Sequence, residues 1–100
     1  EFGDYELDTW LFWIDTLQFL GEFEGAIHNL LRATEYFPEE FQIEYRMAGL
    51  YLMLDDIEKG TFHLNNGLRL NFENHILIET LFPTVWPDQL VQDEIEKYKK

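Results

Sequence analysis

The chain of 100 residues contains no cysteine and no serine. Without cysteine, disulfides, thiolate catalysis and cysteine-based zinc sites are excluded. Without serine, serine nucleophiles are excluded as well. No apolar run reaches the roughly 18 residues that a membrane-spanning helix needs, so we expect no membrane insertion. Valine occurs only twice whereas leucine occurs fifteen times, and the lack of β-branched runs favours helices over strands.

Basic residues are also scarce. Seven lysines and arginines face twenty acidic residues, which gives a net charge of −13. This balance argues against nucleic acid and anionic membranes as partners, because both reward basic side chains. Residues 1–45 carry eleven acidic side chains and Arg32 as their single base. Two interpretations of the acidic charge stay open, a solubilising surface and the electrostatic steering of a basic partner.

A pattern of large and small residues recurs at a spacing of 34. The composition around it is that of one folded domain over residues 1–100, with 46% hydrophobic and 17% aromatic residues. The first copy holds Trp10, Trp13, Ile14, Leu17, Gly21, Phe23, Ala26, Leu30, Ala33 and Pro38. The second holds Glu44, Met47, Ala48, Tyr51, Asp55, Ile57, Gly60, Leu64, Gly67 and Phe72. A fixed period in this range predicts supersecondary units that bury their faces against one another.

The spacing from Trp10 to Pro38 resembles the tetratricopeptide repeat, a helix, a turn and an antiparallel helix. The resemblance covers about residues 7–82 and is closest in the first copy. In the second copy Glu44 replaces an aromatic residue, Gly60 and Gly67 replace the two alanines, and Phe72 replaces the proline. The resemblance implies an all-α fold, an α-α superhelix of TPR type. It also implies that Trp10 and Trp13 are core residues.

Helix signals divide the chain into two helix-turn-helix repeats, a short helix and a C-terminal capping helix. We expect repeat one over about 7–38, repeat two over about 41–72 and a capping segment over about 73–100. The expected helices span about 7–20, 23–36, 40–54, 57–70, 73–82 and 87–99. Gly21 and Pro38 end the helices before them. The last helix places Leu90, Val91, Ile95 and Tyr98 on one apolar stripe, as a terminal cap requires.

The tail resembles the C-terminal ends of some bacterial tetratricopeptide arrays, and the chain begins at Glu1 rather than Met. We therefore expect a piece of a longer array with further repeats upstream. The compartment stays open.

No arrangement of residues predicts catalysis, a metal or a cofactor. The three histidines, His28, His63 and His75, lack the i, i+4 spacing of a helical metal site. Asp55 and Asp56 lack the alternating ligands of a calcium loop and are better explained as a helix cap. The six glycines are scattered, so no phosphate loop exists. We expect a protein that is not an enzyme.

The candidate site is a stripe on the first helix of each repeat. In the family that stripe lines the concave groove where peptides lie. Here it holds Leu11, Asp15, Phe19, Tyr45, Arg46, Gly49, Leu52 and Met53. The predicted function is a scaffold that binds a peptide or helix of a partner protein on this face.

Other interpretations of the stripe stay open. It could contact neighbouring repeats, so that the chain is a purely structural cap, or its aromatic residues could pair between copies of the chain. The best-known subgroup of the family clamps C-terminal carboxylates with lysine and asparagine. Here Leu11 and Asp15 occupy such positions, so we expect no binding of such tails.

Overall fold

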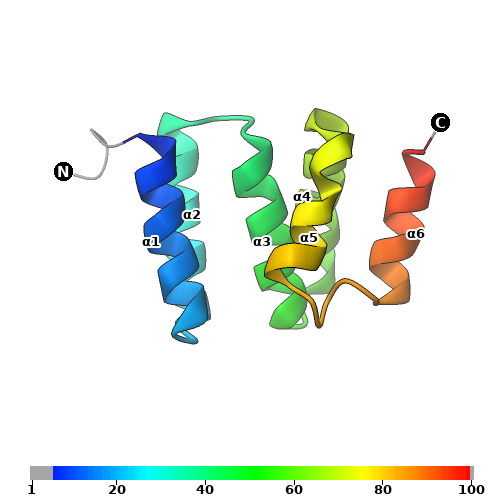
Figure 1. The fold of residues 1–100 in the computed structure, drawn as a ribbon, viewed down its shortest axis with the longest axis horizontal. Helices are drawn as coiled ribbons and strands as arrows, with labels where there is room; N and C mark the ends of the chain where they lie inside the picture. The colour runs from blue at the N-terminus through cyan, green and yellow to red at the C-terminus, as the bar shows by residue number, and fades with distance from the viewer. Residues whose placement is uncertain (1–5, 100) are drawn as a thin grey trace. The chain divides into compact units, whose positions relative to one another are not determined.

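The computed structural model describes residues 6–99, which form six α-helices, one 3₁₀ helix and no strand (Figure 1). The all-helical prediction is confirmed. The elements are α1 (Leu7–Phe19), α2 (Phe23–Tyr36), α3 (Phe41–Met53), α4 (Ile57–Leu70), η2 (Phe72–His75), α5 (Ile76–Leu81) and α6 (Gln89–Lys97). The chain divides after Glu39 into two compact units. Each unit is described by itself.

The first unit is a helical hairpin in which α1 packs against α2. Gly21 allows the tight turn between them, because its φ of +82° lies in the left-handed region that side chains disfavour. The buried residues of α2 recur at helical spacing. They are Ala26, Ile27, Leu30 and Ala33, and on α1 they are Trp10, Leu11 and Ile14. The two alanines bring no bulk to the interface, which favours close packing of the two helices.

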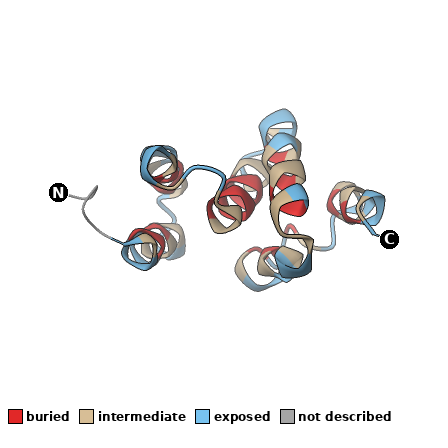
Figure 2. Cartoon of the chain, turned by 90° about the horizontal axis from the view of Figure 1, so that it is seen from above, coloured by how far each residue is buried: buried red, intermediate tan, exposed pale blue. Residues whose placement is uncertain are grey.

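The second unit contains a hairpin of α3 and α4, with α5 packed against α3 and α6 packed against α4. Every residue from Ile43 to Leu50 is buried, which covers about two turns of α3 (Figure 2). A helix that is buried around its whole circumference lies in a core. The centre of this unit is therefore α3.

The helix bounds of the two hairpins differ by the same 34 residues at every point. Helices α1 and α3 have 13 residues each, and α2 and α4 have 14 each. Gly21 and Asp55 lie at equivalent positions of the two turns, and both have positive φ, +82° and +65°. The sequence period therefore corresponds to two hairpins of equal dimensions.

Two glycines of α4 leave room for larger side chains on α3. A Cβ on Gly67 would lie 2.8 Å from the Tyr45 ring, and one on Gly60 would lie 2.6 Å from Leu52. Both distances are far below ordinary contact, so an alanine at either position requires the facing side chain to shift. At Gly67 the facing residue is Tyr45, whereas the equivalent positions of the first hairpin hold Ala33 and the smaller Leu11.

The last helix is fixed to α4 by polar contacts around Asn65. The side-chain amide of Asn65 donates to a carboxylate oxygen of Glu94 at 3.0 Å. The Tyr98 hydroxyl donates to the side-chain oxygen of Asn65 at 2.7 Å. The hydrogen bond from Lys97 lowers the pKa of Glu94, and the Asn65 bond adds to that effect. Val91 and Ile95 are buried beside these contacts. The predicted apolar stripe of the capping helix is confirmed.

The capping segment differs from expectation at two helix starts. The expected helix over 73–82 is divided into η2 and α5, because Asn74 has non-helical backbone angles. The last helix begins at Gln89 and not at Pro87, since Asp88 is its N-cap and accepts from the Leu90 amide at 2.9 Å.

Candidate functional site

Three residues of the predicted groove lie in the interior of the second unit. Tyr45 has no exposed surface, and its hydroxyl donates to the Asn71 carbonyl at 2.7 Å. Arg46 is 6% exposed, and its guanidinium donates to the Gln42 carbonyl at 3.1 Å. Gly49 is buried, and any Cβ there would overlap the Phe82 ring. The expected exposure of these residues is wrong. Phe82, which follows α5, covers Gly49, whereas Tyr45 lies against Gly67 of α4 and bonds to Asn71 beyond it.

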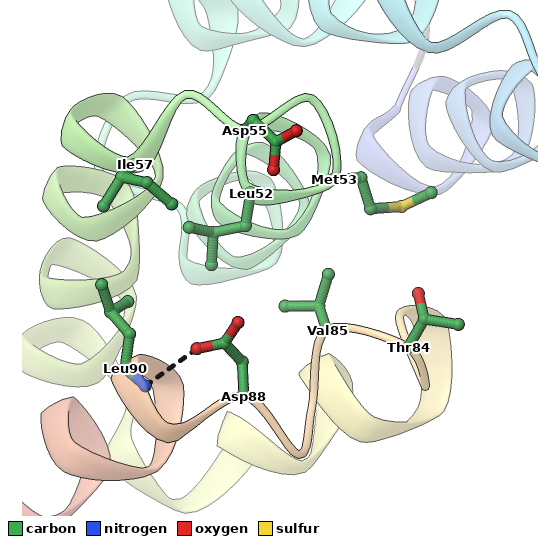
Figure 3. A pocket seen from close by; sticks show the side chains of 8 residues that line it. All are labelled: Leu52, Met53, Asp55, Ile57, Thr84, Val85, Asp88 and Leu90. Atoms are coloured by element: carbon green, nitrogen blue, oxygen red, sulfur yellow. Dashed lines mark hydrogen bonds between the residues drawn. The ribbon is translucent and has the colours of Figure 1, made fainter.

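The remaining two groove residues of the second unit are half-buried and lie together. Leu52 and Met53 form part of the wall of a pocket of about 260 Å³ (Figure 3). The pocket lies between the α3–α4 turn and the connection from α5 to α6. We call it the turn pocket. Its two acidic residues are Asp55 and Asp88. Of the expected cap pair Asp55 and Asp56, it is Asp56 that caps α4, and Asp88 caps α6.

The three predicted groove residues of the first unit differ in exposure. Leu11 is buried at 5% exposure, Asp15 is half-buried, and Phe19 is 88% exposed. The expectation that Trp13 is core is wrong, because 40% of its surface is exposed, whereas Trp10 is completely buried as expected. Trp10 stacks on Tyr36, with ring centroids 6.0 Å apart.

These exposures define an apolar surface on α1. Phe12 is 75% exposed, Phe19 88% and Leu20 65%, and Trp13 lies beside them. Residues seven positions apart share a helix face, so Phe12 lines up with Phe19 and Trp13 with Leu20. We call these four residues the α1 apolar face. Sequence reasoning included only Phe19, although the spacing of the other three was visible.

The polar group nearest the centre of the α1 apolar face is already satisfied. Thr16 lies between Phe12 and Phe19 along the helix, and its hydroxyl donates to the Phe12 carbonyl at 2.8 Å. The face therefore presents carbon to the solvent. On the neighbouring helix α2, Leu31 and Tyr36 are also about half exposed.

The first unit, which carries this face, is strongly acidic. Residues 6–39 carry seven acidic side chains, and Arg32 is the single base. The Arg32 guanidinium lies over the Trp10 ring, 5.9 Å from its centroid. The unit thus combines an exposed apolar stripe with a net negative charge.

A buried polar cluster in the second unit was not predicted. Glu44 is 9% exposed, and one of its oxygens lies 2.8 Å from His63 Nδ1 and accepts from the Asn66 amide at 3.1 Å. The His63 ring stacks on Tyr51. A buried carboxylate needs such partners, so the cluster satisfies Glu44 inside the hairpin. The replacement of an aromatic residue by Glu44 was the only signal in the sequence.

Within residues 6–99, no group of three or more histidines and acids is placed to hold a metal ion. Of the other histidines, His28 is exposed, and His75 stacks on Trp86 with its Nδ1 2.6 Å from the Phe72 carbonyl. None of the described helices is long and apolar enough to cross a bilayer.

Comparison with known proteins gives no match, whether with family models, curated sequences or solved structures. The function is therefore argued from the two surfaces described above, the α1 apolar face and the turn pocket.

Proposed function

We propose that the chain is a protein-interaction module built from two tetratricopeptide-type hairpins, and that it binds a partner helix on the α1 apolar face. The equal dimensions of the two hairpins and the matching positive φ of Gly21 and Asp55 support the repeat assignment. The observation that carries the binding proposal is the exposure of Phe12, Phe19 and Leu20 on one side of one helix. Contiguous exposed aromatic surface is typical of interaction sites.

The chemistry of the face favours an amphipathic helix with basic flanks. Apolar residues at positions 12, 13 and 19 of α1, together with its C-cap residue Leu20, form a ridge that suits the apolar face of a second helix. The acidic residues of the first unit attract lysine and arginine and repel acidic segments. A second copy of the chain fits less well, because its own net negative charge would meet this one.

A designed helix tests the proposal. A peptide of roughly 14 residues matches the length of α1, with leucine on one face and lysine on the other. We expect it to change the fluorescence of Trp13, which is partly exposed. The same peptide with glutamate in place of lysine should bind much more weakly.

The variant Phe19→Asp separates docking from general charge attraction. The added negative charge should strengthen a non-specific attraction to a basic peptide, whereas loss of a central aromatic contact should weaken docking by about tenfold or more. The control is Phe62→Asp, which makes the same charge change at an exposed residue of α4. Equal binding by both variants would refute the docking site.

A structural capping role is the second candidate, and α6 favours it. Val91 and Ile95 of this helix are buried, whereas Asp93, Glu96 and Lys97 are exposed. An apolar inner face and a polar outer face are typical of the last helix of a repeat protein. If no helical peptide binds and the chain is monomeric in analytical ultracentrifugation, the results favour this structural role over partner binding.

A further inference from the structure

The turn pocket of the second unit has an apolar wall built from four parts of the chain. Leu52 comes from the end of α3, Ile57 from the start of α4, and Val85 and Leu90 from the connection to α6 and from α6 itself (Figure 3). Val85 is 8% exposed, Leu52 and Leu90 are half-buried, and Ile57 at the rim is 48% exposed. An alkyl chain can rest on such a wall.

Two carboxylates face the same space from opposite sides. Figure 3 shows the side chain of Asp55 entering from the α3–α4 turn and that of Asp88 entering from the connection below it. No lysine or arginine lines the pocket. The nearest base in sequence, Lys59, lies over the Tyr51 ring with its Nζ 5.5 Å from the centroid. The pocket therefore has two negative groups and no positive group of its own.

Hydrogen bonds hold the backbone on both sides of the pocket before any ligand binds. The connection is tied by the Trp86 amide to the Phe82 carbonyl at 3.0 Å and by the Asp88 amide to the Val85 carbonyl at 3.0 Å. On the opposite side, the Asp55 amide donates to the Leu52 carbonyl at 3.1 Å. Little ordering is left for a ligand to impose, which favours binding.

The size of the pocket limits what it can hold. Its volume of about 260 Å³ is below the range of about 300–1,000 Å³ for pockets that enclose whole ligands. Two carboxylates are also too few for calcium, which takes 6–8 oxygen ligands. A single side chain with an apolar stem and a cationic end fits both the volume and the charge.

We propose that the turn pocket binds a lysine side chain of a partner peptide. The four methylene groups lie along Leu52, Ile57 and Leu90, and the ammonium lies between Asp55 and Asp88. Lysine fits better than arginine because one oxygen of Asp88 already accepts from the Leu90 amide at 2.9 Å. That bond competes with the two-oxygen contact that a guanidinium prefers, whereas a compact ammonium needs one oxygen from each side. This site does not depend on the α1 apolar face.

Titration of the whole chain with short capped peptides tests the assignment by amide chemical shifts. The probe is acetyl-Gly-Lys-Gly-amide, and the matched peptides carry norleucine or arginine in place of lysine. We expect the lysine peptide to shift the amides of Asp55, Asp88 and Leu90, with the arginine peptide weaker and the norleucine peptide inactive. Added salt should weaken the binding.

Two variants locate the ammonium. Asp88→Asn keeps a capping side chain, and Asp55→Gly suits the positive φ of +65° at that position. Each should lower the affinity for the lysine peptide by about two- to fivefold, as loss of an exposed ion pair does. Asp55→Gly should leave the melting temperature unchanged or higher, which separates binding from stability. The control Asp93→Asn removes an exposed acid of α6 that does not line the pocket.

Several results would overturn the proposal. One is the absence of amide shifts with the lysine peptide. Another is a norleucine or arginine peptide that binds as tightly as the lysine peptide. A third is a loss of affinity in Asp93→Asn equal to that in the two pocket variants. A free diamine such as cadaverine that binds as tightly as the peptide would assign the pocket to small amines and not to a partner protein.

Discussion

Two tryptophans three positions apart have different surroundings. Trp10 is fully buried and stacks on Tyr36, whereas Trp13 is 40% exposed. Their spacing turns the second ring about 60° away from the first around the helix. A repeat pattern assigns both to the core, but it cannot show where the edge of the buried face lies. Whether a boundary residue is covered depends on neighbouring elements and not on its own identity.

The two tryptophans should differ in their effect on stability. We expect Trp10→Ala to lower the free energy of unfolding by about 3–5 kcal/mol, as large-to-small core substitutions do. Trp13→Ala should cost about 1 kcal/mol, because much of its ring stays in water. Urea unfolding followed by circular dichroism measures both. Equal losses would mean that Trp13 is as well packed as Trp10.

At the scale of the element, the helices of the hairpins could be predicted and the covering of α3 could not. The expected helices 23–36 and 57–70 agree with α2 and α4 at both ends, because glycine, proline and capping residues mark the ends locally. Tyr45 and Gly49 were expected to be exposed, yet they contact Asn71 and Phe82, which lie 26 and 33 residues further along the chain. Such contacts depend on the return of the chain after α4, which helical periodicity does not describe.

The facing pair Tyr45 and Gly67 should behave as one unit. The equivalent pair in the first hairpin is Leu11 and Ala33, at positions 34 residues earlier. Gly67→Ala alone should destabilise by about 1–3 kcal/mol through overpacking against Tyr45. The double variant Tyr45→Leu with Gly67→Ala should recover part of this loss, giving a coupling energy of about 0.5–3 kcal/mol in a double-mutant cycle. Strictly additive losses would show that the two positions do not constrain each other.

At the scale of the whole molecule, the stability should fall steeply in alkali. Burial raises the pKa of Tyr45 above its ordinary value, whereas in the unfolded chain a tyrosine ionises near pH 10. Because the folded pKa is the higher one, the stabilising effect is complete below about pH 10 and is lost as the pH rises beyond it. The net charge of −13 adds repulsion in the same direction as lysines lose their protons.

Unfolding by urea at pH 8, 10 and 11 measures this dependence, and Tyr45→Phe is the matched control. The variant loses the hydrogen bond to Asn71 and should be less stable at pH 8, by about 0.5–1.5 kcal/mol. Its stability should then decline less between pH 10 and 11 than that of the parent chain. Parallel curves for the two proteins would show that Tyr45 is not the group responsible.

The glycine at position 67, which leaves room for the Tyr45 ring, also has a chemical consequence. It places a glycine directly after Asn66. In a flexible chain, an asparagine followed by glycine cyclises readily to a succinimide and deamidates, since the backbone nitrogen is unhindered. Here α4 holds that nitrogen in the helix, and the Asn66 side chain is bound to Glu44 at 3.1 Å and to Arg69 at 2.8 Å. Ageing damage at Asn66 should therefore occur in the unfolded population. Once formed, the new carboxylate would lie against Glu44 and oppose refolding, so each transient opening carries a risk of permanent loss.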